Sequence, residues 1–297
     1  MLLATCLAAC SPKHEQPAPQ APAAAVPAPA AAVKPVPMAP AADAPTPAPD
    51  KQHQAWMQAI FGSAFDAKQN HALVVIDAEG GGQHHLMTLK STSVLPDGRI
   101  VIVVNGLPSD EHGKDMTGRA SGGVLNVYIV RADAGGWQVL ERREDLASMG
   151  SDGQIGGVDW VMLGPGKPGF TVTSFYTGQG QSVSLTDIVE LGNGMRHLGN
   201  VTLSSDNGGA CTIETDECWE VEGNAAFAGD TSANGYYDLL AVFKGKRYRL
   251  VNGNDGGEVE QVLQTIQNSA RYRLDGAVYK LVAGANPITD QSTTPTP

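Results

Sequence analysis

From residue 71 onward, apolar and polar side chains alternate in short segments that end at Gly- or Pro-containing turns. A period of two is typical of β-strands, because successive side chains of a strand point to opposite faces of the sheet. The chain has 35 Gly among 297 residues and only 17% charged residues, which disfavours a coiled coil or a helical bundle. The sequence therefore predicts an all-β domain.

The turns recur at a regular interval. Gly98, Gly166 and Gly235 each precede a strongly apolar segment, and they are spaced by 68 and 69 residues. A four-stranded unit that recurs at such a period is typical of a propeller blade. We therefore expect about three four-stranded units in a propeller-like domain, with an irregular β-sandwich as the alternative.

Two segments have the periodicity of a helix. In residues 52–69, Trp56, Ile60 and Ala64 recur at every fourth position. In residues 258–267, four apolar residues occupy positions i, i+3, i+4 and i+7. These four are Val259, Val262, Leu263 and Ile266. The sequence predicts a short helix in each segment.

The first residues have the pattern of an export signal. Residues 2–9 are apolar and uncharged, which is too short to span a bilayer but is typical of a secretory signal peptide. The sequence Leu7-Ala8-Ala9-Cys10 resembles the lipobox of bacterial lipoproteins, although no Lys or Arg precedes the apolar run. The resemblance implies removal of residues 1–9 and acylation of Cys10, which together anchor the chain in a membrane. Ser11 stands where inner-membrane members of the family carry Asp, so the resemblance implies the outer membrane, with the domain periplasmic or surface-exposed.

The remaining boundaries follow from composition. Twelve of the 19 prolines precede residue 51, in a stretch otherwise rich in Ala. Such a stretch favours extended polyproline II, so we interpret residues 10–50 as a lipidated tether. Residues 51–285 are the expected globular domain, and the polar segment 286–297 is the expected disordered tail.

Cysteine usage predicts one disulfide. Cys6 lies in the signal peptide and Cys10 is the lipidation site, which leaves Cys211 and Cys218. Two cysteines alone cannot form a four-ligand zinc site. In an oxidising envelope, a local disulfide across this short loop is the expected outcome.

One loop carries a pattern of oxygen side chains. Residues 230–238 have the form D-x-S-x-N-G-x-x-D, in which oxygen ligands alternate around a sharp turn at Gly235. This loop resembles the calcium loop of FG-GAP/VCBS repeats, the blades of integrin-α-like propellers. The resemblance implies one calcium ion bound by Asp230, Ser232, Asn234 and Asp238. The alternative is a hairpin in which Asn234-Gly235 forms the turn and the acidic residues cap backbone amides.

Three further motifs contain residue types that occur in functional sites. GPGKPG at residues 164–169 has the spacing of a dinucleotide-binding loop, but a strand follows it, so it is interpreted as a turn. Asp110, His112 and Asp115 could supply an acid/base group, with a solvated polar loop as the alternative. His84-His85 begins a strand, where alternation separates the two rings, and we interpret both as surface residues.

Two near-identical segments are candidates for a partner surface. Tyr248-Arg249 and Tyr272-Arg273 are each followed by Leu and then by a Gly turn. Exposed Tyr and Arg are common in binding hot spots, and cross-strand pairs on a solvated face are the alternative.

The net charge of −11 disfavours a nucleic-acid partner, because phosphate contacts need clustered Lys and Arg. The sequence-based hypothesis is a non-catalytic, lipid-anchored envelope module that binds a protein or a glycan. The alternative is an envelope hydrolase whose acid and His groups converge only in three dimensions.

Overall fold

The computed structural model describes residues 49–76, 82–192, 194–231 and 233–289. Strands account for 66% of the described residues, which also contain one short α-helix, and this confirms the all-β prediction. The predicted signal peptide, the lipidation site Cys10 and residues 11–48 of the tether lie outside the described residues. Within the described ranges, no helix is both long enough and apolar enough to cross a bilayer.

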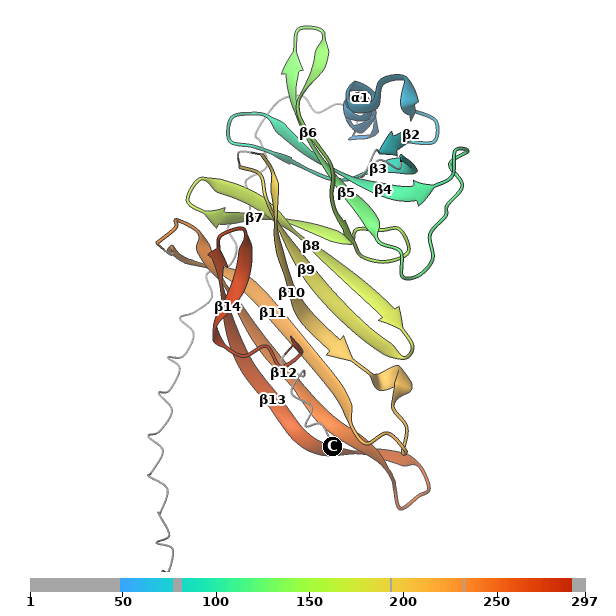
Figure 1. Cartoon of the computed structure of the whole chain (residues 1–297), viewed down its shortest axis with the longest axis vertical. Coiled ribbons are helices and arrows are strands. Elements are labelled where there is room, and N and C mark those ends of the chain that lie inside the picture. The colour runs from blue at the N-terminus through green and yellow to red at the C-terminus, as the bar shows by residue number, and fades with distance from the viewer. Residues whose placement is uncertain (1–48, 77–81, 193, 232, 290–297) are drawn as a thin grey trace, which may run out of the picture. The chain divides into compact units, whose positions relative to one another are not determined.

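The strands form two antiparallel sheets in which each strand pairs with its neighbours in sequence (Figure 1). The six-stranded sheet contains β1 Phe65–Asp66, β2 His71–Ile76, β3 Gln83–Val94, β4 Ile100–Ser109, β5 Gly123–Asp133 and β6 Gly136–Met149. The eight-stranded sheet contains β7 Gly157–Gly164, β8 Lys167–Gly178, β9 Gln181–Glu190, β10 Arg196–Asp206, β11 Cys218–Thr231, β12 Tyr237–Asn252, β13 Glu258–Asp275 and β14 Val278–Gly284. Neither sheet closes, and the three expected four-stranded units are not confirmed, since the strands divide as six and eight.

The first predicted helix is present but shorter than expected. Helix α1 spans Pro49–Phe61, and Gly62, with φ of 56°, begins a 3-10 turn that leads into β1. One face of α1 packs on the six-stranded sheet and buries Trp56 and Ile60. Arg142 Nη2 of β6 donates a hydrogen bond of 2.5 Å to the Ile60 carbonyl at the C-terminal end of α1. A cation is favoured at this end of a helix, because the last carbonyl groups carry partial negative charge.

The second predicted helix is wrong. Residues 258–267 belong to β13, which pairs with β12 from Asn252 opposite Glu258 to Leu239 opposite Tyr272. The partner strand supplies backbone hydrogen bonds along this whole length, and this long-range pairing outweighs the helical spacing of the apolar residues. Most of the segment is exposed, so the spacing does not mark a buried helix face.

The two sheets pack face to face through a common core. Strand β4 is apolar at every position from Ile100 to Val104, because α1 covers one of its faces and the eight-stranded sheet covers the other. On the second face, Val101 and Val103 of β4 meet Phe170 and Val189 of the larger sheet. Side chains from both sheets thus fill a single layer between them.

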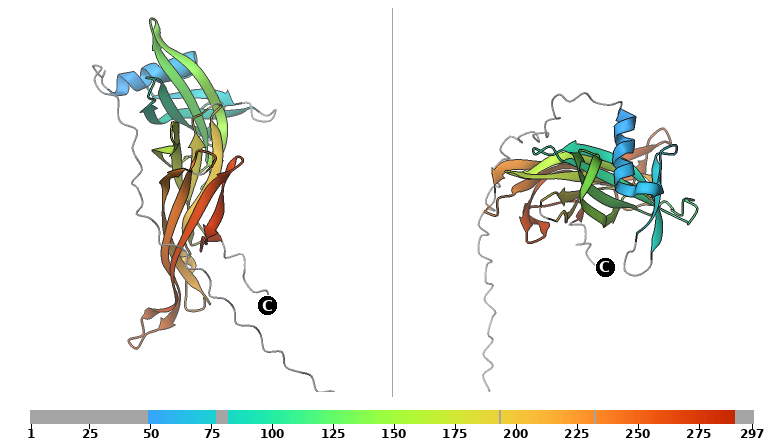
Figure 2. Two further views of the ribbon diagram at one scale, coloured as in Figure 1. Left: turned by 90° about the vertical axis from the view of Figure 1, so that its left-hand side faces the viewer. Right: turned by 90° about the horizontal axis from the view of Figure 1, so that it is seen from above.

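The other face of the eight-stranded sheet curves around a core of its own (Figure 2). Leu163 of β7 and Tyr279 of β14 belong to one cluster although these strands are the two edges of the sheet. The β7–β8 turn also closely approaches the β11–β12 turn, where a Cβ on Gly164 would contact the Gly235 carbonyl oxygen. This curvature brings the predicted calcium loop beside β7, β8 and β13.

The folded part extends past the expected boundary at Ala285. Asn286 is buried, and its Nδ2 donates to the Thr202 carbonyl at 3.0 Å and to Tyr272 Oη at 2.9 Å. It therefore ties the chain after β14 to β10, which helps to hold the sheet in its curved form.

Candidate functional site

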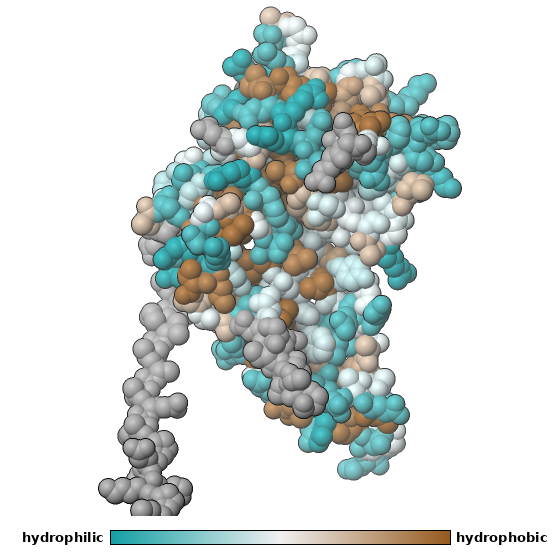
Figure 3. Space-filling model, viewed as in Figure 1, coloured by the Kyte–Doolittle hydropathy of each residue, from teal (hydrophilic) through white to brown (hydrophobic). Residues whose placement is uncertain are grey.

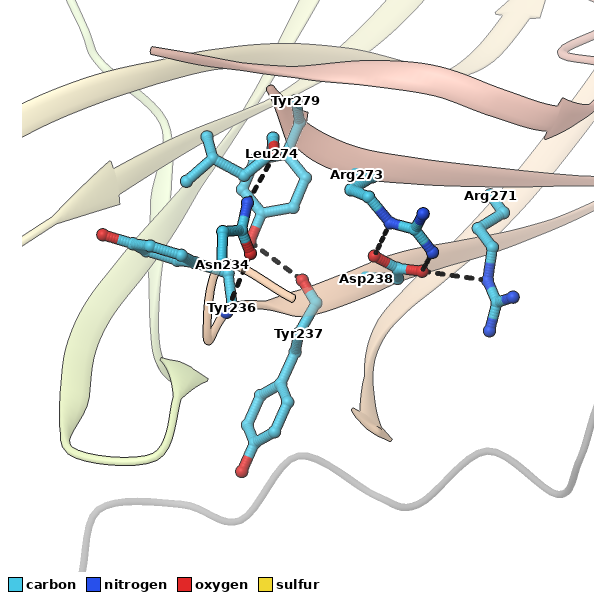
Figure 4. Close-up of polar contacts among 8 residues, drawn as sticks. All are labelled: Asn234, Tyr236, Tyr237, Asp238, Arg271, Arg273, Leu274 and Tyr279. Atoms are coloured by element: carbon cyan, nitrogen blue, oxygen red, sulfur yellow. Dashed lines mark hydrogen bonds and ion pairs between the residues drawn. The ribbon is translucent and has the colours of Figure 1, made fainter. Parts of the chain in front are cut away.

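The loop predicted to bind calcium is the turn between β11 and β12. Gly235 has φ of 77°, the left-handed conformation that favours glycine. Asn234 Nδ2 donates to the Leu274 carbonyl at 2.7 Å, and Asn234 Oδ1 accepts the backbone N–H of Tyr236 at 3.1 Å (Figure 4). The Asn234 side chain therefore fixes the turn and links it to β13, as the hairpin alternative expects of a capping residue.

Asp238, the last predicted ligand, is held by two arginines of β13. Its side chain is only 5% exposed, and it accepts hydrogen bonds from Arg273 Nε at 2.9 Å and Arg273 Nη2 at 2.8 Å. Arg271 Nε lies 3.2 Å from the same carboxylate (Figure 4). A buried carboxylate requires such compensation, and its hydrogen bond in turn raises the pKa of Arg273.

The structure thus describes only some of the four residues predicted to bind calcium. Ser232 and the side chain of Asp230 lie outside the described residues. Among the side chains that are described, no three His, Cys, Asp or Glu residues come close enough to hold a metal ion. Calcium binding remains a prediction, and it requires Asp238 to exchange its arginine partners for the ion.

A second polar group lies at the same end of the sheet, around Glu190. This carboxylate is buried and accepts the Tyr236 hydroxyl at 2.6 Å and Arg196 Nε at 3.0 Å. Lys167 Nζ lies 4.4 Å from the centre of the Tyr236 ring. Burial and the hydrogen bond to Glu190 raise the pKa of Tyr236, so its hydroxyl stays a proton donor at neutral pH.

The loop at residues 110–115 uses its acids to hold its own backbone. Asp110 Oδ1 accepts the N–H groups of Lys114 at 2.8 Å and His112 at 2.9 Å, and these bonds lower the pKa of Asp110. Asp115 Oδ1 accepts the hydroxyl and the N–H of Thr117, both at 2.7 Å. The His112 side chain is 82% exposed.

One of the two adjacent histidines differs from the surface prediction. His85 is buried, so its interpretation as a surface residue is wrong. Alternation in β3 places it on the same face as Met87, toward the core below α1. Its Nδ1 lies 2.9 Å from the Gln83 carbonyl, and burial lowers the pKa of His85.

The predicted partner residues are only partly accessible. Tyr248 and Tyr272 are buried, at 7% and 8% exposure. Arg249 donates to Gln261 Oε1 at 2.7 Å, and Arg273 pairs with Asp238. The arginines are therefore the accessible members of this pair of motifs.

The predicted disulfide is confirmed between Cys211 and Cys218. It closes the loop before β11, with the two Cα atoms 5.8 Å apart and the Cys218 side chain buried. The bond fixes the chain where β11 begins its pairing with Tyr248 of β12.

Sequence reasoning missed one buried acid–imidazole pair. His197 Nε2 of β10 lies 2.8 Å from Asp187 Oδ1 of β9, and Asp187 is only 4% exposed. Asn200 Nδ2 lies 3.5 Å from the same oxygen. The available signal was an Asp directly before the apolar pair Ile188-Val189 in a predicted strand, since a buried carboxylate needs a partner from a neighbouring element.

No protein-family model, curated protein or solved structure matches this chain.

Proposed function

We propose that this protein is a lipid-anchored binding module of the bacterial cell envelope that presents its β-rich domain to a partner protein. The lipobox resemblance and the Ala/Pro-rich segment support the anchor and the tether. The main support for binding is the exposed end of the β12–β13 hairpin.

This hairpin extends past the strands beside it (Figures 1 and 2). Strand β11 pairs with β12 only as far as Tyr248, and β14 pairs with β13 only from Ala270 onward. In the described part of the chain, no strand pairs with the outward edge of residues 258–269. An open strand edge offers backbone donors and acceptors to an extended segment of another chain.

The hydrogen-bonding direction along this edge follows from one contact. The Ser269 carbonyl accepts the Ala285 N–H at 3.0 Å, so the backbone groups of Ser269 point away from β12. Because alternate residues of an antiparallel strand point the same way, those of Gln267 and Thr265 also point outward. These two residues offer the outward donors and acceptors of the proposed docking edge.

Exposed apolar side chains accompany the open edge. Val259, Val262 and Leu263 are 46%, 53% and 48% exposed. Apolar patches are visible among hydrophilic ones at the lower end of Figure 3, where the hairpin ends in Figure 1. Burial of these side chains would add apolar stabilisation to the backbone pairing.

Strand β6, the long edge strand of the six-stranded sheet, is protected against pairing with another chain. Residues 141–145 of β6 are all charged, and two register shifts interrupt its pairing with β5. The open edge of β13 carries only two charged side chains, Glu258 and Glu260 at the hairpin end, residues 261–269 carry none, and a single register shift occurs there. Charges and bulges are the usual protection of a free edge, so the contrast favours β13 as a docking strand.

The experiment is site-specific photo-crosslinking of the full-length protein in cells. A benzophenone amino acid at Leu263 should form an adduct with a second envelope protein, and Val262→Lys in the same chain should abolish that adduct. The matched control position is Asp133, which is exposed at the end of the β5–β6 hairpin. Equal adducts at both positions, or none at Leu263, would contradict the proposal.

One structural calcium ion rests on the loop resemblance alone, and a propeller-like relationship rests on that resemblance and on the regular spacing of Gly98, Gly166 and Gly235. A calcium site at the β11–β12 turn predicts that millimolar Ca²⁺ raises the Tm and that Asp230→Asn removes this rise. A Tm that neither Ca²⁺ nor a chelator changes would leave this turn with a purely structural role.

The Asp187–His197 pair supports a second candidate, an envelope hydrolase. A buried carboxylate that orients an imidazole is one part of many acid/base sites. This candidate predicts that Asp187→Asn abolishes a hydrolytic activity of the purified protein while its circular dichroism spectrum is retained. Activity that survives this variant would exclude the pair from the reaction.

A further inference from the structure

The arginine pair around Asp238 has more hydrogen-bond donors than its carboxylate uses. Each guanidinium carries five N–H donors. Arg273 donates hydrogen bonds from Nε and Nη2 to Asp238, whereas Arg271 Nε forms an ion pair with the carboxylate at 3.2 Å and no hydrogen bond. The two terminal nitrogens of Arg271 point away from Asp238 (Figure 4), and neither forms a hydrogen bond or an ion pair with another described residue.

The charges of Asp238, Arg271 and Arg273 do not cancel. One carboxylate faces two guanidinium groups, which leaves a net positive charge in a chain whose formal charge is −11. Lys280 lies directly opposite Arg273 on β14, and its Nζ pairs with Asp275 at 2.9 Å. Three cations and two carboxylates therefore face the same side of the sheet.

Both guanidinium groups are accessible and held in place. The side chains of Arg271 and Arg273 are 43% and 45% exposed, while Asp238 at their base is 5% exposed. Arg271 Nε is buried and has no hydrogen-bond partner among the described residues, and its ion-pair contact with Asp238 at 3.2 Å holds this side chain beside Arg273. A fork that is already oriented loses less conformational entropy when it binds an anion.

We propose that Arg271 and Arg273, positioned by Asp238, form a binding site for an oxyanion group of a ligand, a carboxylate or a phosphate. The planar fork of Arg271 matches two oxygens of such a group. Arg273 and Lys280 add positive charge at the rim. This site is separate from the β13 edge used in the proposed function, and neither depends on the other.

A single variant tests the site while the fold is retained. Arg271→Gln removes the outward fork but leaves Arg273 to compensate Asp238, so we expect the Tm to change little. Arg249→Gln is the matched control, because Arg249 also lies in the β12–β13 pair and its guanidinium contacts Gln261. Arg271→Lys keeps the charge but removes the fork geometry.

The measurement is NMR of the Arg Nε–Hε groups in the full chain at low ionic strength, titrated with inorganic phosphate and, separately, with acetate. We expect a saturable shift at Arg271 and Arg273, an affinity at least tenfold weaker in Arg271→Gln, intermediate in Arg271→Lys and unchanged in Arg249→Gln. Saturation by phosphate alone or by acetate alone assigns the class of anion, and saturation by both assigns a general oxyanion site. Shifts that do not saturate, that are equal at all arginines or that persist unchanged in Arg271→Gln would overturn the proposal.

Discussion

Asp238 carries a charge that the fold has buried, and Arg271 and Arg273 compensate it from the neighbouring strand. The carboxylate thereby connects the start of β12 with the end of β13. Because the carboxylate positions both guanidinium groups, the proposed anion site depends on this contact.

Replacement of Asp238 with Asn should destabilise the fold by about 1–3 kcal/mol, because Arg271 and Arg273 lose their common counter-charge and Arg273 loses charge-assisted hydrogen bonds. Urea unfolding followed by Trp fluorescence measures this change. Asp275→Asn is the control, since Asp275 and Lys280 form an exposed pair that should contribute little. An equal effect of the two variants would contradict the structural role of Asp238.

His85 should make stability depend on pH. Burial lowers its pKa in the folded state, so between the folded value and the unfolded value of about 6.5 the unfolded chain binds more protons. The contribution of neutral His85 to the free energy of unfolding is therefore present above pH 6.5, and it is lost as the pH falls below that value. Unfolding free energies from pH 7.5 to 5 should fall less steeply in His85→Leu than in the wild type, with His84→Gln as the control for loss of an imidazole. An unchanged slope in His85→Leu would contradict this account.

Single residues also show what the sequence can predict. Cys211 and Cys218 were predictable, because elimination of the other cysteines left one pair. The burial of His85 was not, because alternation separates two faces without showing which one is covered. The Asp187–His197 contact depends on the pairing of β9 with β10, which a single sequence does not specify.

At the scale of elements, the β12–β13 hairpin determines most of what we propose. Its strands contain 16 and 18 residues, longer than the strands around them. The sequence predicted a helix for part of β13 because four apolar residues happened to have helical spacing. In the strand, Val262 and Leu263 lie at the register shift, which explains why the alternation is broken there.

The disulfide should stabilise the start of β11, and its reduction should cost about 2–3 kcal/mol in the chain-entropy account of a short loop. Thermal unfolding with and without dithiothreitol measures this difference. The double variant Cys211→Ser/Cys218→Ser should have the Tm of the reduced protein and no response to the reductant. A wild-type Tm that is insensitive to reduction, with free thiols demonstrated, would be inconsistent with this role.

At the scale of the whole molecule, composition and alternation predicted the all-β class, but not how the strands divide. The regular Gly spacing suggested three equivalent units, whereas the chain forms meanders of six and eight strands. The division depends on which faces bury one another: β4 and β5 lie between α1 and the larger sheet, and the larger sheet curves around its own core. Such pairings are long-range and leave no periodic signal in the sequence.

The most direct test of the central claim is hydrogen–deuterium exchange of the full-length protein, compared in native envelope membranes and in purified form. Docking at the β13 edge predicts slower exchange for residues 258–269 in the envelope, while residues 123–133 of β5 exchange equally in both. Equal exchange of residues 258–269 in the two samples would contradict the claim that this edge is the docking surface.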